Sequence, residues 1–183
     1  MADGQFYNDT REPAIESDIA AVTLATTLKA LYPASNFPFL GGQYFARKGK
    51  KIMIRLFGRM TTVLTPGNGV MSVLYGTGAD AAGVVLASTA AHALAASQTA
   101  LSWEARVYVH CRSPGNVGTL FCTGNLTYNS ALVATRQPIP ASSPVVSTAC
   151  DLTAANIISV QYSRSGSTVE TMQVHDMEVI ALN

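Results

Sequence analysis

The stretch Leu101–Arg112, LSWEARVYVHCR, decides the fold class of this 183-residue chain. Apolar and polar residues alternate strictly along it, which is the pattern of a long antiparallel strand with one buried face. The apolar positions are Leu101, Trp103, Ala105, Val107, Val109 and Cys111. At helical spacing the same side chains would spread around the whole cylinder. The pattern therefore predicts an all-β protein in which Trp103 anchors the core.

The sequence on both sides of this stretch supplies further strands and turns. Thr65–Gly69 and Ser113–Gly118 both combine Pro, Gly and Asn, a strong turn signal. Residues 20–32 fit either a strand or a helical turn, and we predict a strand; Gly58 is expected to mark a bend or bulge. Strand-like runs occupy residues 50–63, 70–75, 84–88, 119–128, 157–163 and 168–182. We predict a jelly roll or β-sandwich of about eight antiparallel strands, forming a single domain over residues 21–183.

Composition narrows the classes of partner. The chain is 48% hydrophobic and only 13% charged, about half the usual charged share, so its surface is expected to be rich in uncharged polar residues or partly covered by partners. A net charge of +1 argues against nucleic acid as the main partner, because phosphate binding requires a basic excess. The N-terminus lacks the features of a signal peptide, and the apolar stretch 83–101 is interrupted by polar residues, so no membrane partner is expected. Cys111 and Cys122 are expected to be buried free thiols.

Charge is unevenly distributed along the chain. Five acidic residues fall within the first eighteen, against Arg11 alone. Six basic residues lie within thirteen positions: Arg47, Lys48, Lys50, Lys51, Arg55 and Arg59. Two interpretations remain open. These segments are an acidic tail and a solvated basic hairpin, or one of them meets an oppositely charged surface on a neighbouring subunit. Residues 1–20 are expected to form an extended arm outside the domain.

No catalytic constellation is evident. His92, His110 and His175 are far apart and lack the His-x-His spacing of a metal site on this kind of fold, so neither a metal nor a cofactor is expected. His175 and Asp176 are neighbours that should point to opposite sides of a strand. Glu104 and Glu170 are expected to be separate and exposed, which argues against a pair of carboxylates for glycoside hydrolysis. No nucleophile elbow or phosphate-binding loop is present. We expect that the chain is not an enzyme.

One family resemblance spans about Tyr44 to Asn183. It is carried by Tyr44–Lys50, by Ile52-x-Ile54 leading to Gly58-Arg59-x-Thr61-Thr62, and by Trp103-Glu104 running into Cys111-Arg112-Ser113. Thr65-Pro-Gly67, Leu74-Tyr75-Gly76, Leu126-x-Tyr128 and the ending Ala181-Leu-Asn183 complete the order. This order resembles a group of tailed-bacteriophage virion proteins taken to be capsid decoration (cement) proteins or minor capsid components.

The resemblance implies a structural protein on the capsid surface of a virion, assembled in the cytoplasm of a bacterial host. Its implied partners are the phage major capsid protein and itself, as a homotrimer, with a jelly-roll fold and no catalytic residues. The expected partner contacts are Phe6, Tyr7, Arg11 and Ile15 in the arm, and Arg47, Lys48 and Lys50 in the basic segment. The alternative is a receptor- or glycan-binding jelly roll of a phage fibre or other head or tail appendage, which would use Tyr108 or Tyr128 as an exposed aromatic.

Overall fold

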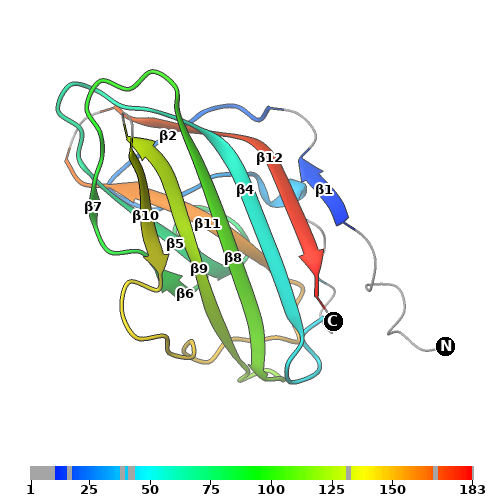
Figure 1. The fold of residues 1–183 in the computed structure, drawn as a ribbon. Coiled ribbons are helices and arrows are strands. Elements are labelled where there is room, and N and C mark those ends of the chain that lie inside the picture. The colour runs from blue at the N-terminus through cyan, green and yellow to red at the C-terminus, as the bar shows by residue number, and fades with distance from the viewer. Residues whose placement is uncertain are drawn as a thin grey trace.

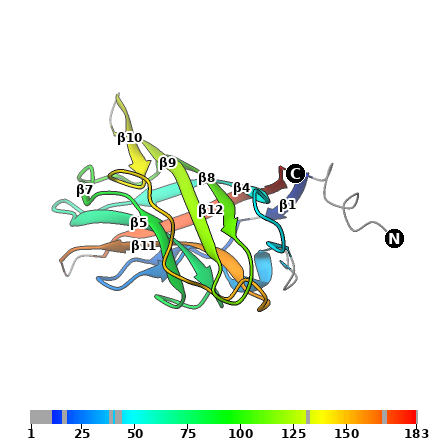
Figure 2. The same cartoon turned by 90° about the horizontal axis from the view of Figure 1, so that it is seen from below.

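A computed structural model of the chain describes residues 11–15, 18–37, 40, 44–130, 133–166 and 169–182. Two antiparallel sheets form a β-sandwich, seen as two layers in Figures 1 and 2. Sheet A runs in the order β1 (Arg11–Ile15), β12 (Thr171–Ala181), β4 (Lys51–Thr61), β8 (Leu101–Ser113), β9 (Thr119–Ser130) and β10 (Val133–Ile139), with β2 (Val22–Thr23) also paired to β12. Sheet B runs in the order β3 (Lys29–Ala30), β11 (Ile157–Arg164), β5 (Asn68–Gly76) and β6 (Val84–Ser88), with β7 (His92–Ala93) paired to β5. A short 3-10 turn covers Ala34–Asn36.

The predicted fold class is confirmed: the described residues form an all-β sandwich. Within residues 21–183, the strands of at least five residues are β4, β5, β6, β8, β9, β10, β11 and β12, so their number agrees with the predicted eight, although β10 lies in a segment that was not predicted to be a strand. The alternation in β8 also has the predicted effect, because Trp103 and Val107 are buried while Glu104 and Arg106 face outward. Cys111, Cys122 and Cys150 are buried free thiols, as expected for the first two.

The two sheets differ in what covers their outer faces. Gln161 lies on the face of β11 opposite the core residues Val160 and Tyr162, yet it is fully buried. Its amide donates to the carbonyl of Ala79 at 2.9 Å and its oxygen accepts from the Ala81 N–H at 2.8 Å. The loop after β5 therefore covers this part of the outer face of sheet B. The outer face of sheet A remains half-exposed along β4, β8 and β9.

The bulge predicted at Gly58 lies on the neighbouring strand instead. The register between β12 and β4 shifts between Val174 and Asp176, so the extra residue is His175. Gly58 is paired with Trp103 on its other side. A Cβ atom at Gly58 would lie only 1.9 Å from the Gln173 carbonyl oxygen and 2.8 Å from the Trp103 ring. Gly58 thus leaves the space that the bulged strand and the tryptophan both need.

The N-terminal part of the chain departs from the predicted organisation. β1 pairs with β12, and the Ile19 N–H donates to the Val174 carbonyl at 3.2 Å. The described part of segment 1–20 is therefore extended and is attached to sheet A through β12, and the division into an arm and a domain at residue 20 stays a prediction. Residues 1–10 lie outside the described part of the chain. Of the strand predicted over 20–32, only β2 and β3 form.

Candidate partner-binding surface

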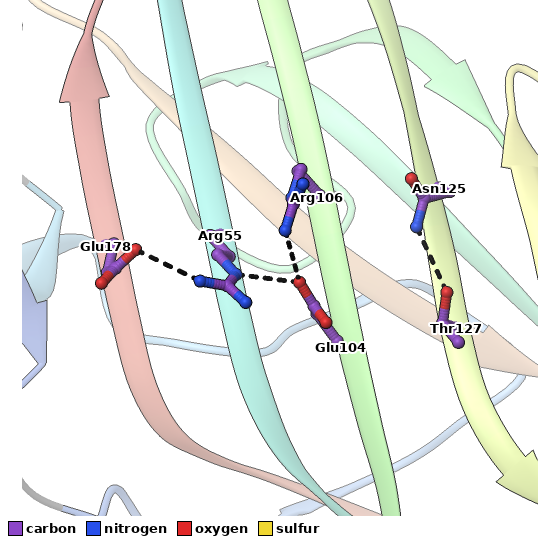
Figure 3. A network of polar contacts seen from close by, with 6 residues as sticks. All are labelled: Arg55, Glu104, Arg106, Asn125, Thr127 and Glu178. Carbon is purple, nitrogen blue, oxygen red and sulfur yellow. Dashed lines mark hydrogen bonds and ion pairs between the residues drawn. The ribbon is translucent and has the colours of Figure 1, made fainter.

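The outer face of sheet A carries a charged row across four adjacent strands. The ladder places Glu178, Arg55, Arg106 and Asn125 side by side on β12, β4, β8 and β9. Arg55 and Arg106 are directly opposite each other, a juxtaposition of like charges that is unfavourable on its own. Figure 3 shows how carboxylates relieve it.

Glu104 is the shared partner of the two arginines. Its Oε1 lies 2.8 Å from Arg55 Nε and 3.2 Å from Arg106 Nη2 (Figure 3). Glu178 lies farther from Arg55, with 3.9 Å between Oε2 and Nη1. The two positive charges of the row are thus balanced by Glu178 in the same row and by Glu104, which lies two residues before Arg106 on β8. Because the side chains are 22–40% exposed, each pair is expected to add about 1 kcal/mol or less to stability.

An apolar row runs beside the charged one. Ile180, Met53, Tyr108 and Thr123 are paired in that order on β12, β4, β8 and β9. All four side chains are half-exposed. Tyrosine and methionine are enriched at the centres of protein interfaces relative to the rest of a protein surface. This row therefore has the side-chain composition that is typical of interface centres.

The third row is basic and aromatic, and it lies at the end of the sheet where β4 begins. Lys51 pairs with His110, His110 with Phe121, and Phe121 forms a bridge with Val146 of the long connection after β10. The Arg112 guanidinium lies over the Phe121 ring, 4.4 Å from its centroid. The edge-on contact of His110 with the same ring has a centroid distance of 6.0 Å.

The predicted basic segment joins this row. The Gly49 N–H donates to the Cys111 carbonyl, and the Cys111 N–H donates to the Lys50 carbonyl, both at 2.8 Å, which fixes the loop against the end of β8. Arg47 and Lys48 are exposed, while Lys50 is half-buried. We name the basic end by its six members, Arg47, Lys48, Lys50, Lys51, His110 and Arg112.

The positive charges of the basic end act on one another. Burial lowers the pKa of His110, and the charges of Lys51 and Arg112 lower it further. Burial also lowers the pKa of Lys50, with a second contribution from the charge of Arg47. Both effects disfavour the protonated forms, as expected where cations lie together. An anion bound here would be stabilised by the same field.

The predicted contact residues have different outcomes. The structure brings Arg47, Lys48 and Lys50 together, and it adds Lys51, Arg112, His110 and Phe121, which sequence reasoning did not assign to a site. Arg11 and Ile15 have their backbone in β1, and their side chains lie outside the described part of the structure. Phe6 and Tyr7 lie outside it altogether. Their predicted contacts therefore stay predictions.

Two predictions of exposed side chains are wrong. Glu170 is fully buried and lies against the nearly buried Arg164, with 2.8 Å between Oε2 and Nε. Tyr128 is 3% exposed, and its hydroxyl donates to the Ala93 carbonyl at 3.2 Å. Tyr128 faces the core because it shares the inward parity of Leu126 on β9. Of the two tyrosines proposed for glycan binding, only Tyr108 is therefore accessible.

The prediction for His175 and Asp176 is also wrong. The bulge leaves both side chains half-exposed between the buried Val174 and Met177, rather than on opposite sides of the strand. His175 Nδ1 is hydrogen-bonded to the Asp18 carboxylate. This contact fastens the segment before β2 to β12.

His92 belongs to a buried polar cluster that joins the two sheets. Its Nδ1 lies 3.1 Å from the Ala90 carbonyl oxygen, and its Nε2 lies 2.8 Å from the Tyr162 hydroxyl. A carbonyl only accepts, so Nδ1 carries the proton and Nε2 accepts from Tyr162 in the neutral ring. The ring also stacks on Tyr128 of sheet A, with a centroid distance of 5.5 Å. This arrangement favours neutral histidine, and burial lowers the His92 pKa.

We expect the free energy of unfolding to fall as the pH drops from 7 to 5. Because the pKa of His92 is lower in the folded chain than the unfolded value of about 6.5, the unfolded chain binds the proton more readily. The stabilisation is complete above about pH 6.5 and is lost progressively below it. Urea unfolding of the wild type and of His92→Gln at pH 5, 6 and 7 measures the effect, and the variant should show the weaker pH dependence.

His110 contributes with the same sign, since its pKa is also lowered. His110→Gln is therefore the matched control. It should remove a smaller part of the pH dependence of the free energy of unfolding, because His110 is half-exposed. Equal pH dependence in the wild type and in His92→Gln would contradict the assignment of a neutral, buried His92.

A hollow of about 420 Å³ is lined mainly by alanine and other apolar side chains from residues 19–22, 30–33 and 78–80. Its one charged lining residue, Asp80, is held by Lys29 at 2.7 Å.

Within the part of the chain that is described, no three His, Cys, Asp or Glu residues are grouped closely enough to hold a metal ion. No helix in that part is long and apolar enough to cross a membrane. No family model and no curated protein matches the chain.

Proposed function

We propose that the chain is a structural virion protein that binds the outside of a tailed-phage capsid as a homotrimer and stabilises the lattice. The observation that carries the proposal is the outer face of sheet A. It presents arginine, tyrosine, methionine and phenylalanine side chains in continuous rows, and these residue types are enriched in protein interfaces. A face that extends over several strands suits a macromolecular partner better than a small substrate.

The strand pairing supports a jelly roll as the finer description of the sandwich. β1 pairs with β12, β3 with β11, β4 with β8, and β5 with β6. These pairs are nested, so that the first strand meets the last and the innermost two form a hairpin. A long antiparallel hairpin that is rolled up gives this order, and β9 and β10 then extend sheet A beyond β8. Jelly rolls occur in viral capsid and lectin domains, so the order fits the proposal without deciding it.

Stabilisation follows from binding only the assembled lattice. A ligand that binds the mature lattice and not the free capsid subunit shifts the assembly equilibrium by mass action. Many copies with modest contacts then give a large total effect, and a trimer adds avidity, because its second and third contacts are intramolecular. No chemical step is required of any residue in such a mechanism.

We expect the purified protein to cosediment with empty expanded phage heads that lack it. Binding should saturate at a fixed ratio to the capsid subunit, and light scattering of the free protein should give the mass of a trimer. A free trimer that stays in the supernatant at every protein concentration would reject the capsid proposal.

A second arm of this experiment tests the N-terminal contacts. The deletion should remove residues 2–10 and leave residues 11–20 intact, because β1, Asp18 and Ile19 are bonded to β12. If Phe6 and Tyr7 contact the capsid, the shortened protein keeps its fold and loses head binding. Unchanged binding by the shortened protein would show that these residues are not contacts.

One observation favours the alternative function in glycan recognition. Tyr108 is half-exposed, and it lies between His110 and Arg106 on the outer face of β8 and opposite Thr123. An exposed aromatic ring beside hydrogen-bonding side chains is suited to stacking on a sugar. This alternative predicts that the isolated protein binds a saccharide in a glycan screen and that Tyr108→Ala abolishes the binding, with no affinity for phage heads.

A further inference from the structure

We propose that the basic end docks an acidic polypeptide segment of the capsid partner, one that also carries apolar side chains. The inference rests on the proposed function and deepens it, because it assigns the contact to one end of sheet A and gives the partner's chemistry. The sequence indicated only Arg47, Lys48 and Lys50. The structure adds Lys51, His110 and Arg112 to the charged surface, and Phe121 and Val146 as its apolar part.

The first step of the argument is the charge balance at this end. No Asp or Glu occurs between residues 19 and 79, or between residues 105 and 150. These ranges include the basic loop, the end of β8, the start of β9 and the segment around Val146. The charged row nearby is different, because its two arginines face two glutamates. Arg47, Lys48 and Arg112 make no ion pair with any residue in the described ranges.

Asp151, the acidic residue nearest to Val146 along the chain, does not neutralise this surface. It follows the bridge between Gly118 and Cys150, at the same end of the molecule. Its Oδ1 accepts from the Thr153 N–H at 2.8 Å and from the Thr153 hydroxyl. These hydrogen bonds lower the pKa of Asp151, so it stays charged, but they hold its carboxylate within its own turn.

The second step is the apolar surface beside the cations. Val146 is 50% exposed, and its neighbour Val145 is 67% exposed. Val117, in the turn between β8 and β9, is 72% exposed. Phe121 is bracketed by the Arg112 guanidinium on its face and by His110 at its edge. Exposed valines beside a cation-covered phenylalanine favour a partner that brings apolar groups together with its carboxylates.

The third step is the shape of the row. Lys51, His110, Phe121 and Val146 lie on four successive segments, and adjacent strands are about 4.8 Å apart. The surface therefore extends from Lys51 and His110 to the apolar Phe121 and Val146 across four segments, which is broader than the site for one small anion. An extended acidic segment lying across the strands matches this extent. The low net charge of the whole chain disfavours a long polyanion such as nucleic acid.

His110 provides a built-in reporter of docking. The neighbours that face it are Lys51, Arg112 and Phe121, and the two cations help to lower its pKa. A carboxylate brought to this row would offset their field and raise the His110 pKa. A purely apolar contact would bury the imidazole and lower the His110 pKa further. The direction of the change therefore separates the two kinds of partner.

The test uses the full chain and a synthetic peptide of alternating Glu and Phe as the probe. Lys48→Glu/Arg112→Glu reverses two exposed charges in the basic end, and Arg59→Glu/Arg136→Glu reverses two exposed charges elsewhere on sheet A. Net charge changes equally in both variants. We expect the peptide to raise the His110 pKa, measured by NMR, and the first variant to bind it about tenfold more weakly or worse. The second variant should stay within about twofold of the wild type.

The other outcomes overturn the inference. Equal weakening in both variants would mean that only net charge matters. A larger response of His110 to inorganic phosphate or to a single-stranded oligonucleotide than to the peptide would assign the surface to another anion. Lys48→Gln/Arg112→Gln keeps the test valid if charge reversal disturbs folding, which Trp103 fluorescence reports.

Head binding separates this inference from the proposed function. Loss of cosedimentation in Lys48→Glu/Arg112→Glu alone supports both. Equal cosedimentation of the two charge-reversal variants with the wild type rejects the basic end as the contact and leaves the proposed function standing. If the wild-type protein binds the peptide but not the heads, the proposed function is rejected. The acidic segment that the peptide represents then cannot be assigned to the capsid.

Discussion

Gly58→Ala is expected to lower the free energy of unfolding by about 3 kcal/mol or more, or to prevent folding. The added Cβ would lie 1.9 Å from the Gln173 carbonyl oxygen, which belongs to the backbone of the adjacent strand β12. It would also lie 2.8 Å from the Trp103 ring, which has little room to move because it is buried in the core. Relief would require β4 and β12 to separate next to the bulge. Urea unfolding, monitored by the fluorescence of the single tryptophan, measures the loss.

Two controls locate the cause of this effect. Arg59→Ala changes the next residue of β4, which is exposed, and should cost about 0.5 kcal/mol or less. Gly58→Ala/Trp103→Phe reduces the ring but leaves the clash with the backbone oxygen, so the second substitution should not restore stability; this variant is followed by circular dichroism. A loss below about 1 kcal/mol for Gly58→Ala would contradict the close packing at this position.

Local patterns in the sequence were sufficient for the strands but not for their register. The alternation in Leu101–Arg112 predicts β8 because a half-buried strand repeats every two residues, whatever its neighbours are. The clustering of Arg47, Lys48 and Lys50 is likewise local. Arg112 and Phe121 join them only through the pairing of β8 with β4 and β9. Register depends on contacts between distant segments. Local sequence patterns therefore could not predict which residues complete the basic end.

The wrong predictions have physical causes of two kinds. The prediction of an exposed Tyr128 conflicts with its parity, which it shares with Cys122, a residue predicted to be buried; the regular alternation on β9 is the better guide. The predictions for His175 and Glu170 are wrong for a reason that the local sequence does not reveal. A bulge changes the parity of β12 at His175, and the turn between β11 and β12 brings Arg164 onto Glu170. Neither feature leaves a distinctive local pattern.

The buried pair of Arg164 and Glu170 closes the end of the sandwich opposite the basic end. The side chains are 8% and 0% exposed, with 2.8 Å between Nε and Oε2. The Nε–H of Arg164 is not directed at Oε2 of Glu170 as a hydrogen bond requires, so the two side chains form an ion pair at this contact. Glu170 Oε1 also accepts from the Gly67 N–H at 3.3 Å, and Arg164 donates to the Gly166 carbonyl. The pair thus ties β11 and β12 to the turn before β5.

Arg164→Met is expected to cost about 3–5 kcal/mol, because it removes the cation that faces the fully buried carboxylate of Glu170. Glu170→Gln should cost a similar amount by leaving the guanidinium uncompensated. Arg164→Met/Glu170→Gln removes both charges and keeps an acceptor for Gly67, so it should cost clearly less than the sum of the single substitutions. Urea unfolding of the four proteins gives this coupling. If the two single effects simply add, the pair is not coupled, and its geometry contributes nothing beyond the packing of two side chains.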